Sequence, residues 1–125
     1  MKIKGGFVTN SSSTCYVLDK RHLTEEELTL IREGNETLML PYYYGAGRSS
    51  VYGEGADVVY YLEWLKDDDA AWGRENYLAR FLRDGVRKIG GENIIFVRAS
   101  DEDMGGHVQH EDLIAEKAVA GMEYH

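Results

Sequence analysis

The segment that decides the fold is residues 10–18, NSSSTCYVL, in which five hydroxyl or amide side chains lead into an apolar run. Residues 15–18, CYVL, are short, apolar and rich in β-forming side chains, so they are predicted to form a buried strand. Asn, Ser and Thr side chains hydrogen-bond to nearby backbone groups, and residues 10–14 are therefore interpreted as the structural entry to that strand. The alternative is an anion-binding concavity that includes Gly5 and Gly6, but the pattern matches neither of the glycine-rich phosphate motifs.

A helix signal follows at residues 23–34. Thr24 and Glu27 stand at the positions of a capping box, which predicts a helix that begins at Glu25 and ends at Gly34. Two further strands are predicted from short apolar runs. They are residues 37–40 (TLML), ended by a proline, and residues 94–97 (IIFV).

Three more helices are predicted from apolar spacing. The first, over residues 58–65 and capped by Asp57, carries apolar residues on all sides, so it should be buried on two sides or bind a partner. The acidic run at residues 67–69 is expected to end this helix, and Asp69 is expected to cap a second, long helix that stops at residues 90–91 (GG). Residues 111–120 are predicted to form the last helix.

These elements are interspersed without regular strand–helix alternation. The sequence therefore predicts an α+β fold, with a small three- to four-stranded sheet covered by helices on one face. The chain of 125 residues, 43% apolar, is expected to form a single domain.

Composition narrows the classes of function. The net charge of −8 argues against general nucleic-acid binding. No apolar run is long enough to span a bilayer, and the start MKIKGGFV lacks a signal-peptide core, so a cytoplasmic protein without membrane contact is expected. The single cysteine, Cys15, lies in an apolar run and is expected to be a buried small hydrophobe rather than a reactive thiol.

The start of the chain resembles a group of short bacteriophage and prophage proteins. Members open with a basic residue or two, then GFVSNSSSSSF and an apolar strand, and often continue with a helix that starts LTEEE. The matching text here is GFVTNSSSTCYVL at residues 6–18 and LTEEEL at residues 23–28, with departures from the serine run at Thr9, Thr14 and Cys15. The resemblance covers about the first third of the chain. It implies a phage setting, in the host cytoplasm, and carries over no catalytic residue.

The most unusual composition is that of residues 42–55, YYYGAGRSSVYGEG. Tyrosine with glycine and serine is typical of binding surfaces, because each ring brings a large contact area at low entropic cost. The alternative is that tyrosines cover the core while glycines turn the chain. The candidate binding residues of this loop are Tyr42, Tyr43, Tyr44, Arg48, Ser49 and Tyr52.

Two weaker candidates come from basic residues and histidines. Arg80, Arg83 and Arg87 share one helix face and could bind an anion, although a solvated outer face explains them as well. His107 and His110 stand beside acidic residues, but no third ligand is fixed by the spacing, so a solvated loop and helix cap is favoured over a metal site. The sequence thus predicts no metal, no cofactor and no catalytic residue.

The preferred hypothesis is a small acidic phage-type accessory protein that binds a host or phage protein. It would act as a counter-defence or host-takeover inhibitor, or as a virion-associated component. The alternative is a small-molecule binder that sequesters a nucleotide signal through the tyrosine loop. An enzyme is the weaker third reading, and the apolar helix over residues 58–65 would also suit a homo-oligomer.

Overall fold

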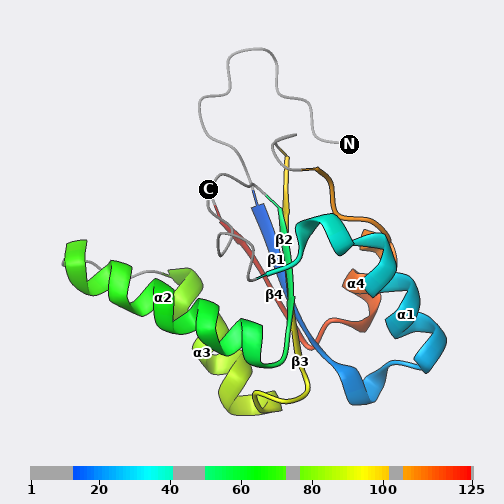
Figure 1. Ribbon diagram of the computed structural model, residues 1–125, viewed down its shortest axis with the longest axis horizontal. Helices are drawn as coiled ribbons and strands as arrows, with labels where there is room; N and C mark the ends of the chain where they lie inside the picture. Colours follow the sequence, from blue (N-terminus) through cyan, green and yellow to red (C-terminus); the bar gives the residue numbers. More distant parts are fainter. Residues whose placement is uncertain (1–12, 41–49, 73–76, 102–105, 125) are drawn as a thin grey trace.

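The computed structural model describes residues 13–40, 50–72, 77–101 and 106–124, with the backbone alone for residues 68–72 and 124. These residues form a four-stranded antiparallel sheet with helices packed against it (Figure 1). The elements follow one another as β1 (Ser13–Asp19), η1 (Lys20–His22), α1 (Glu25–Gly34), η2 (Glu36–Leu38), β2 (Val51–Glu54), α2 (Ala56–Trp72), α3 (Tyr77–Ile89), β3 (Ile94–Ser100), α4 (Glu111–Lys117) and β4 (Ala120–Tyr124). The α+β class and the small sheet are as predicted.

The sheet has the strand order β2-β3-β1-β4. The central pair joins β1 to β3, with Val17 opposite Phe96, and β4 lies on the other side of β1, with Val17 opposite Ala120. The predicted strands at residues 15–18 and 94–97 are therefore the two central strands. Both are buried because each has neighbours on two sides and helices above and below.

Helices cover both faces of the sheet, which corrects the expectation of cover on one face only. In Figure 1, α2 and α3 lie on one side of the strands and α1 and α4 on the other. The α2/α3 core consists of Cys15, Val17, Leu40, Val51, Val58, Tyr61, Leu62, Leu65, Leu78, Ala79, Leu82, Ile89, Ile94 and Phe96. The α1/α4 core consists of Leu18, Ile31, Leu38, Tyr52, Ile95, Val97 and Ile114. The physical reason is that β1 and β3 are apolar at consecutive positions, so each strand presents a hydrophobic surface in both directions.

The predicted start of α1 is confirmed in detail. The Thr24 hydroxyl accepts a hydrogen bond from the Glu27 backbone N–H at 3.0 Å, and the Glu27 carboxylate accepts one from the Thr24 N–H at 2.9 Å. This reciprocal pair satisfies two N–H groups that the first turn of a helix leaves without partners. The helix ends at Gly34, as expected.

The long helix α3 also follows its predicted pattern. Leu78, Leu82, Gly85 and Ile89 are buried on its inward face. A Cβ atom at Gly85 would lie 3.1 Å from the Val17 side chain, so glycine lets the helix approach β1 closely.

The acidic run does not break α2. The helix begins at Ala56, which places Asp57 in its first turn, and it continues to Trp72, so Asp69 caps no following helix. An aspartate within a helix costs only about 0.5 kcal/mol relative to better helix formers, and two alanines follow the run. The buried residues at the 0, 3, 4, 7 spacing anchor the first half of the helix to the sheet; they are Val58, Tyr61, Leu62 and Leu65.

The predicted second strand at residues 37–40 is wrong. The 3-10 helix η2 occupies the first two residues of this segment, where the Leu38 N–H donates to the Asn35 carbonyl at 3.0 Å, and Met39 forms only an isolated bridge to Tyr52. The strand at this position of the sheet is β2, inside the segment expected to be a loop. Glycine in β2 has a packing role, because a Cβ atom at Gly53 would lie 2.7 Å from the Leu40 side chain.

The predicted last helix is too long. α4 ends at Lys117, Ala118 is extended, and Val119 N–H donates to the Val17 carbonyl at 2.8 Å. The chain then adds β4 to the edge of the sheet beside β1. Pairing with a central strand thus outweighs the helical pattern of the last residues.

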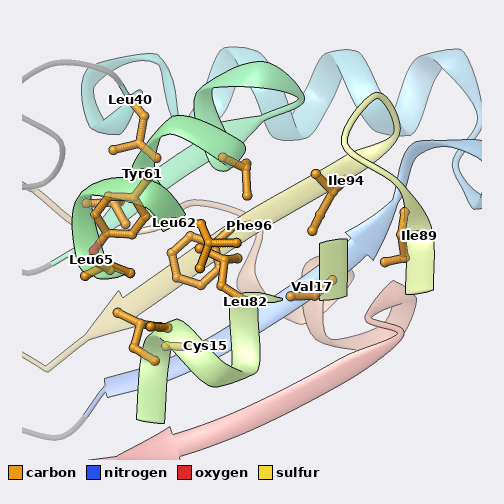
Figure 2. Packing of buried hydrophobic residues seen from close by; sticks show 14 residues of the cluster. Cys15, Val17, Leu40, Tyr61, Leu62, Leu65, Leu82, Ile89, Ile94 and Phe96 are labelled. Atoms are coloured by element: carbon orange, nitrogen blue, oxygen red, sulfur yellow. The ribbon is translucent and has the colours of Figure 1, made fainter. Parts of the chain in front are cut away.

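Figure 2 shows how the α2/α3 core closes around the ring of Phe96. The ring lies between Tyr61 of α2 and Leu82 of α3, above Cys15 and Val17 of β1. The Tyr61 and Phe96 ring centroids are 5.9 Å apart with an angle of 33° between the ring planes. This contact fixes α2 against the centre of the sheet.

Candidate functional site

The tyrosine loop falls mostly outside the described residues. Tyr42, Tyr43, Tyr44, Arg48 and Ser49 lie there, so these candidates remain predictions.

Tyr52, by contrast, belongs to the core and not to a binding surface. Tyr52 lies in β2 opposite Val97. This register directs the Tyr52 side chain to the α1/α4 face, where the side chain is fully buried. Its hydroxyl donates to a carboxylate oxygen of Glu54 at 2.8 Å. Burial raises the pKa of the Tyr52 phenol, and the charge of Glu54 raises it further. The nucleotide-binding alternative therefore loses Tyr52 as a stacking ring.

Glu54 is the centre of a polar network that ties three elements together. Arg32 of α1 donates two hydrogen bonds to its carboxylate, each at 2.8 Å, and the Lys20 ammonium lies 3.2 Å away. Burial acts to raise the pKa of Glu54, but the hydrogen bonds from Arg32, Tyr52 and Lys20 outweigh it and lower the pKa to about 2. A carboxylate held this firmly by donors is a structural anion and is poorly suited to act as a general base at neutral pH.

The arginine stripe lies on the outer face of α3. Arg80, Arg83 and Arg87 are all exposed, opposite the buried stripe of the same helix. The Arg80 guanidinium lies 5.7 Å from the centroid of the Tyr77 ring, and Arg87 lies 3.8 Å from Asp84. These contacts run along the helix surface and fit the interpretation as a solvated face.

The two histidines lie in an exposed segment at the start of α4. His107 is exposed, and His110 stands at the N-cap position with φ of 59°, without a side-chain capping bond. Within the described ranges, no group of three or more His, Cys, Asp or Glu side chains could hold a metal ion.

The single cysteine is buried in the α2/α3 core. Burial raises the pKa of the Cys15 thiol to about 12, although the positive charge of Arg98 acts to lower it. The thiolate needed for nucleophilic chemistry is therefore scarce at neutral pH. The expectation of a buried small hydrophobe is confirmed.

The helix over residues 58–65, expected to be buried on two sides or to bind a partner, lies in α2 and carries an exposed surface for which the sequence analysis named no binding residue. Tyr60 is 64% exposed and Trp64 is 42% exposed, one helical turn apart, and we call these two residues the α2 aromatic surface. Trp64 stacks on Tyr61 with ring centroids 5.9 Å apart and an interplanar angle of 13°. Because Tyr61 in turn contacts Phe96, a row of rings extends from the core to the exposed tryptophan. The signal was present in the sequence, since apolar residues of this helix extend beyond its buried stripe.

No family model matches the chain, and no curated protein or solved structure is significantly similar to it. No helix in the part of the chain that the structure describes is both long and apolar enough to cross a membrane.

Proposed function

We propose that this chain is a small acidic accessory protein of bacteriophage type that binds a host or phage protein. In the finer form of the proposal it is a counter-defence or host-takeover inhibitor, or a virion-associated component, and it acts in the host cytoplasm. The phage setting is supported by the resemblance of residues 6–18 and 23–28 to the phage and prophage group. The net charge of −8 favours a partner with a basic surface.

The observation that carries the proposal is the α2 aromatic surface. Tryptophan and tyrosine contribute most to binding energy at protein interfaces, above all where they are held in place before the partner arrives. Trp64 meets this condition because its ring is stacked on the buried Tyr61, so little side-chain freedom is lost on binding. Tyr60 lies one turn away and is more exposed, which extends the contact area along the helix.

The test compares three forms of the full-length chain as baits in a bacterial lysate. They are the wild type, Tyr60→Arg, and the control Leu30→Arg, which makes the same kind of change at a residue of α1 that is 46% exposed. We expect at least one bacterial protein to be enriched by the wild type and by Leu30→Arg, and its recovery to fall about tenfold or more with Tyr60→Arg. Tyr60→Arg should change the free energy of unfolding by less than about 0.5 kcal/mol, because the side chain is largely in solvent.

Two results would contradict the proposal. One is that no protein is enriched by the wild type, or that all three baits recover the same proteins equally. The other comes from native mass spectrometry of the same preparations. A homodimer that Tyr60→Arg dissociates would assign the α2 aromatic surface to a second copy of the chain.

A further inference from the structure

The two edges of the sheet are not equivalent. At one edge, β2 is partly covered, because Leu40 N–H donates to the Tyr52 carbonyl at 2.8 Å and Met39 bridges Tyr52. At the other edge, β4 pairs with β1 and with no other strand in the part of the chain that the structure describes. An edge strand of this kind offers a row of backbone N–H and C=O groups to an incoming strand.

On the α2/α3 face, an apolar groove runs beside β4. Its volume is about 310 Å³, and its floor is Val17 of β1. Phe81 and Ile89 of α3 form one wall, while Val119 and Ala120 form the side next to β4. Two exposed residues of opposite charge on α3, Asp84 and Lys88, complete the lining, so the groove is mainly apolar with no net charge from its side chains. Ala120 of β4 lines the groove and is partly exposed. A strand added to β4 would direct every second side chain to this face, over Ala120 and toward the groove.

On the opposite face, the same edge is acidic. The Tyr16 hydroxyl donates to a carboxylate oxygen of Glu111 at 2.7 Å. Glu123 lies opposite Thr14 in the register of β4 with β1, on the same face as Tyr16. Burial is the largest cause that raises the pKa of the Tyr16 phenol. The hydrogen bond to Glu111 and the negative charges of Glu111, Glu123 and Asp112 raise this pKa further. Three exposed carboxylates thus act electrostatically on one phenol beside the outer edge of β4.

We propose that the outer edge of β4, unpaired among the residues that the structure describes, binds an extended segment of a partner protein in which basic and apolar residues alternate. The backbone of this segment would extend the sheet, its apolar side chains would pack into the groove, and its basic side chains would face the carboxylates. The period of two in a strand matches the two faces of this edge, one apolar and one acidic. The proposed site at β4 is separate from the α2 aromatic surface. The helix α2 packs on β2 and β3, toward the opposite edge of the sheet.

Charge decides between this occupant and a second copy of the chain. Antiparallel pairing of β4 with β4 from another molecule would bring Glu111, Asp112 and Glu123 of both copies to one face of the joined sheet. Like charges across neighbouring strands are destabilising, whereas lysine or arginine at the same positions is favourable. The acidic face therefore favours a basic strand over a homodimer at this edge.

The probe for the test is a fluorescein-labelled peptide of sequence KVKVKVK, measured by fluorescence anisotropy with the full-length protein at low and high salt. A peptide of the same composition in the order KKVVVKK carries the same charge without the alternation. We expect the alternating peptide to bind at least about tenfold more tightly and to slow hydrogen exchange of the backbone amides of residues 119–124. Equal binding of the two peptides, or binding without slower exchange at β4, would overturn the proposal.

Two charge-reversal variants locate the acidic contribution. Glu123→Lys should weaken binding of the alternating peptide about tenfold, because it replaces an attraction by a repulsion. Glu92→Lys makes the same change in net charge in the turn before β3, beside Gly55, which directly follows β2, and should leave the affinity within about twofold. Equal effects of the two variants would show that the peptide responds only to net charge.

A third variant tests the groove. Ala120→Trp fills the space between α3 and β4 and should abolish binding of the alternating peptide, with the far-UV circular dichroism spectrum of the fold retained. Undiminished binding would exclude the groove from the site. Sedimentation of the wild type completes the test, since a dimer that Ala120→Trp converts to a monomer would identify the occupant as a second copy and overturn the proposal.

Discussion

The two faces of the sheet are attached to their helices by different physical means. The α2/α3 core is built from apolar side chains that close around Phe96 (Figure 2). The α1/α4 face combines a smaller apolar core with buried or half-buried polar groups, among them Asn35 and Glu54. Asn35 is fully buried, and its side chain donates to the carbonyls of Ile31 and Gln109 at 2.8 and 3.2 Å and accepts from the Gln109 N–H at 2.8 Å.

The two faces should therefore differ in how well they tolerate substitution and in how strictly they fix the positions of their helices. Apolar contacts are non-directional, so the α2/α3 face should accept substitutions that preserve volume. Hydrogen bonds and ion pairs require defined partners, so the α1/α4 face fixes the positions of α1 and of the segment before α4 more strictly. It should also respond to pH, because charged groups contribute to it.

The largest expected effect is the loss of the central ring on the α2/α3 face. Phe96→Ala should lower the free energy of unfolding by about 3–5 kcal/mol, since it removes the side chain that contacts Tyr61 and leaves a cavity under both helices. Urea unfolding followed by circular dichroism measures the change. For comparison, Ile95→Ala truncates the neighbouring residue of the same strand, which faces the α1/α4 core. A cost below about 1.5 kcal/mol for Phe96→Ala would show that the ring is not central.

A smaller effect is expected from the buried amide on the other face. Asn35→Ala should cost about 2–3 kcal/mol, because the Ile31 carbonyl loses a buried hydrogen-bond partner and the Gln109 N–H loses a part-buried one. The same unfolding experiment measures it, with Glu36→Ala at the exposed next residue as the control. If the two variants were equally stable, water would replace the amide at no cost and the polar attachment of α1 would be weak.

The sequence predicted those parts of the fold that local patterns encode. The capping box located the start of α1, the apolar stripe located α3, and two apolar runs located β1 and β3. β2 and β4 were missed because each contains a glycine, Gly53 or Gly121, and neither has the alternating pattern of a strand. Each is a strand because it pairs with β3 or β1, and that pairing is far away in the sequence.

The same limit applies to the candidate sites. Tyr52 stood in a segment with the composition of a binding loop, and only its register opposite Val97 directs it to the α1/α4 core. The apolar character of the helix over residues 58–65 was visible in the sequence. However, the sequence could not tell which of its rings are buried, and the structure separates the buried Tyr61 from the exposed Tyr60 and Trp64.

The two faces should differ in how their contribution to stability depends on pH. The folded protein lowers the pKa of Glu54 from its ordinary value of 4.5 to about 2, so ionised Glu54 favours the folded state. The stabilisation should be fully present above about pH 5 and should be lost as the pH falls from 4.5 toward 2, because the unfolded chain takes up the proton first. We expect this stabilisation to be about 2 kcal/mol. It is smaller than the difference between the folded and unfolded pKa values alone would give, because solvent screens the partly exposed Arg32 and Lys20.

Glu54→Gln removes the charge and keeps the shape of the side chain, so it isolates this contribution from that of other carboxylates. The variant should be less stable than the wild type by about 2 kcal/mol at pH 7, and the difference should shrink as the pH is lowered through 4 toward 2.5. Glu36→Gln makes the same chemical change at an exposed position and should show a small difference throughout. A difference between Glu54→Gln and the wild type that stayed constant from pH 7 to 2.5 would mean that Arg32 and Tyr52 hold the side chain by hydrogen bonds alone. The α1/α4 face would then be as insensitive to pH as the apolar face opposite.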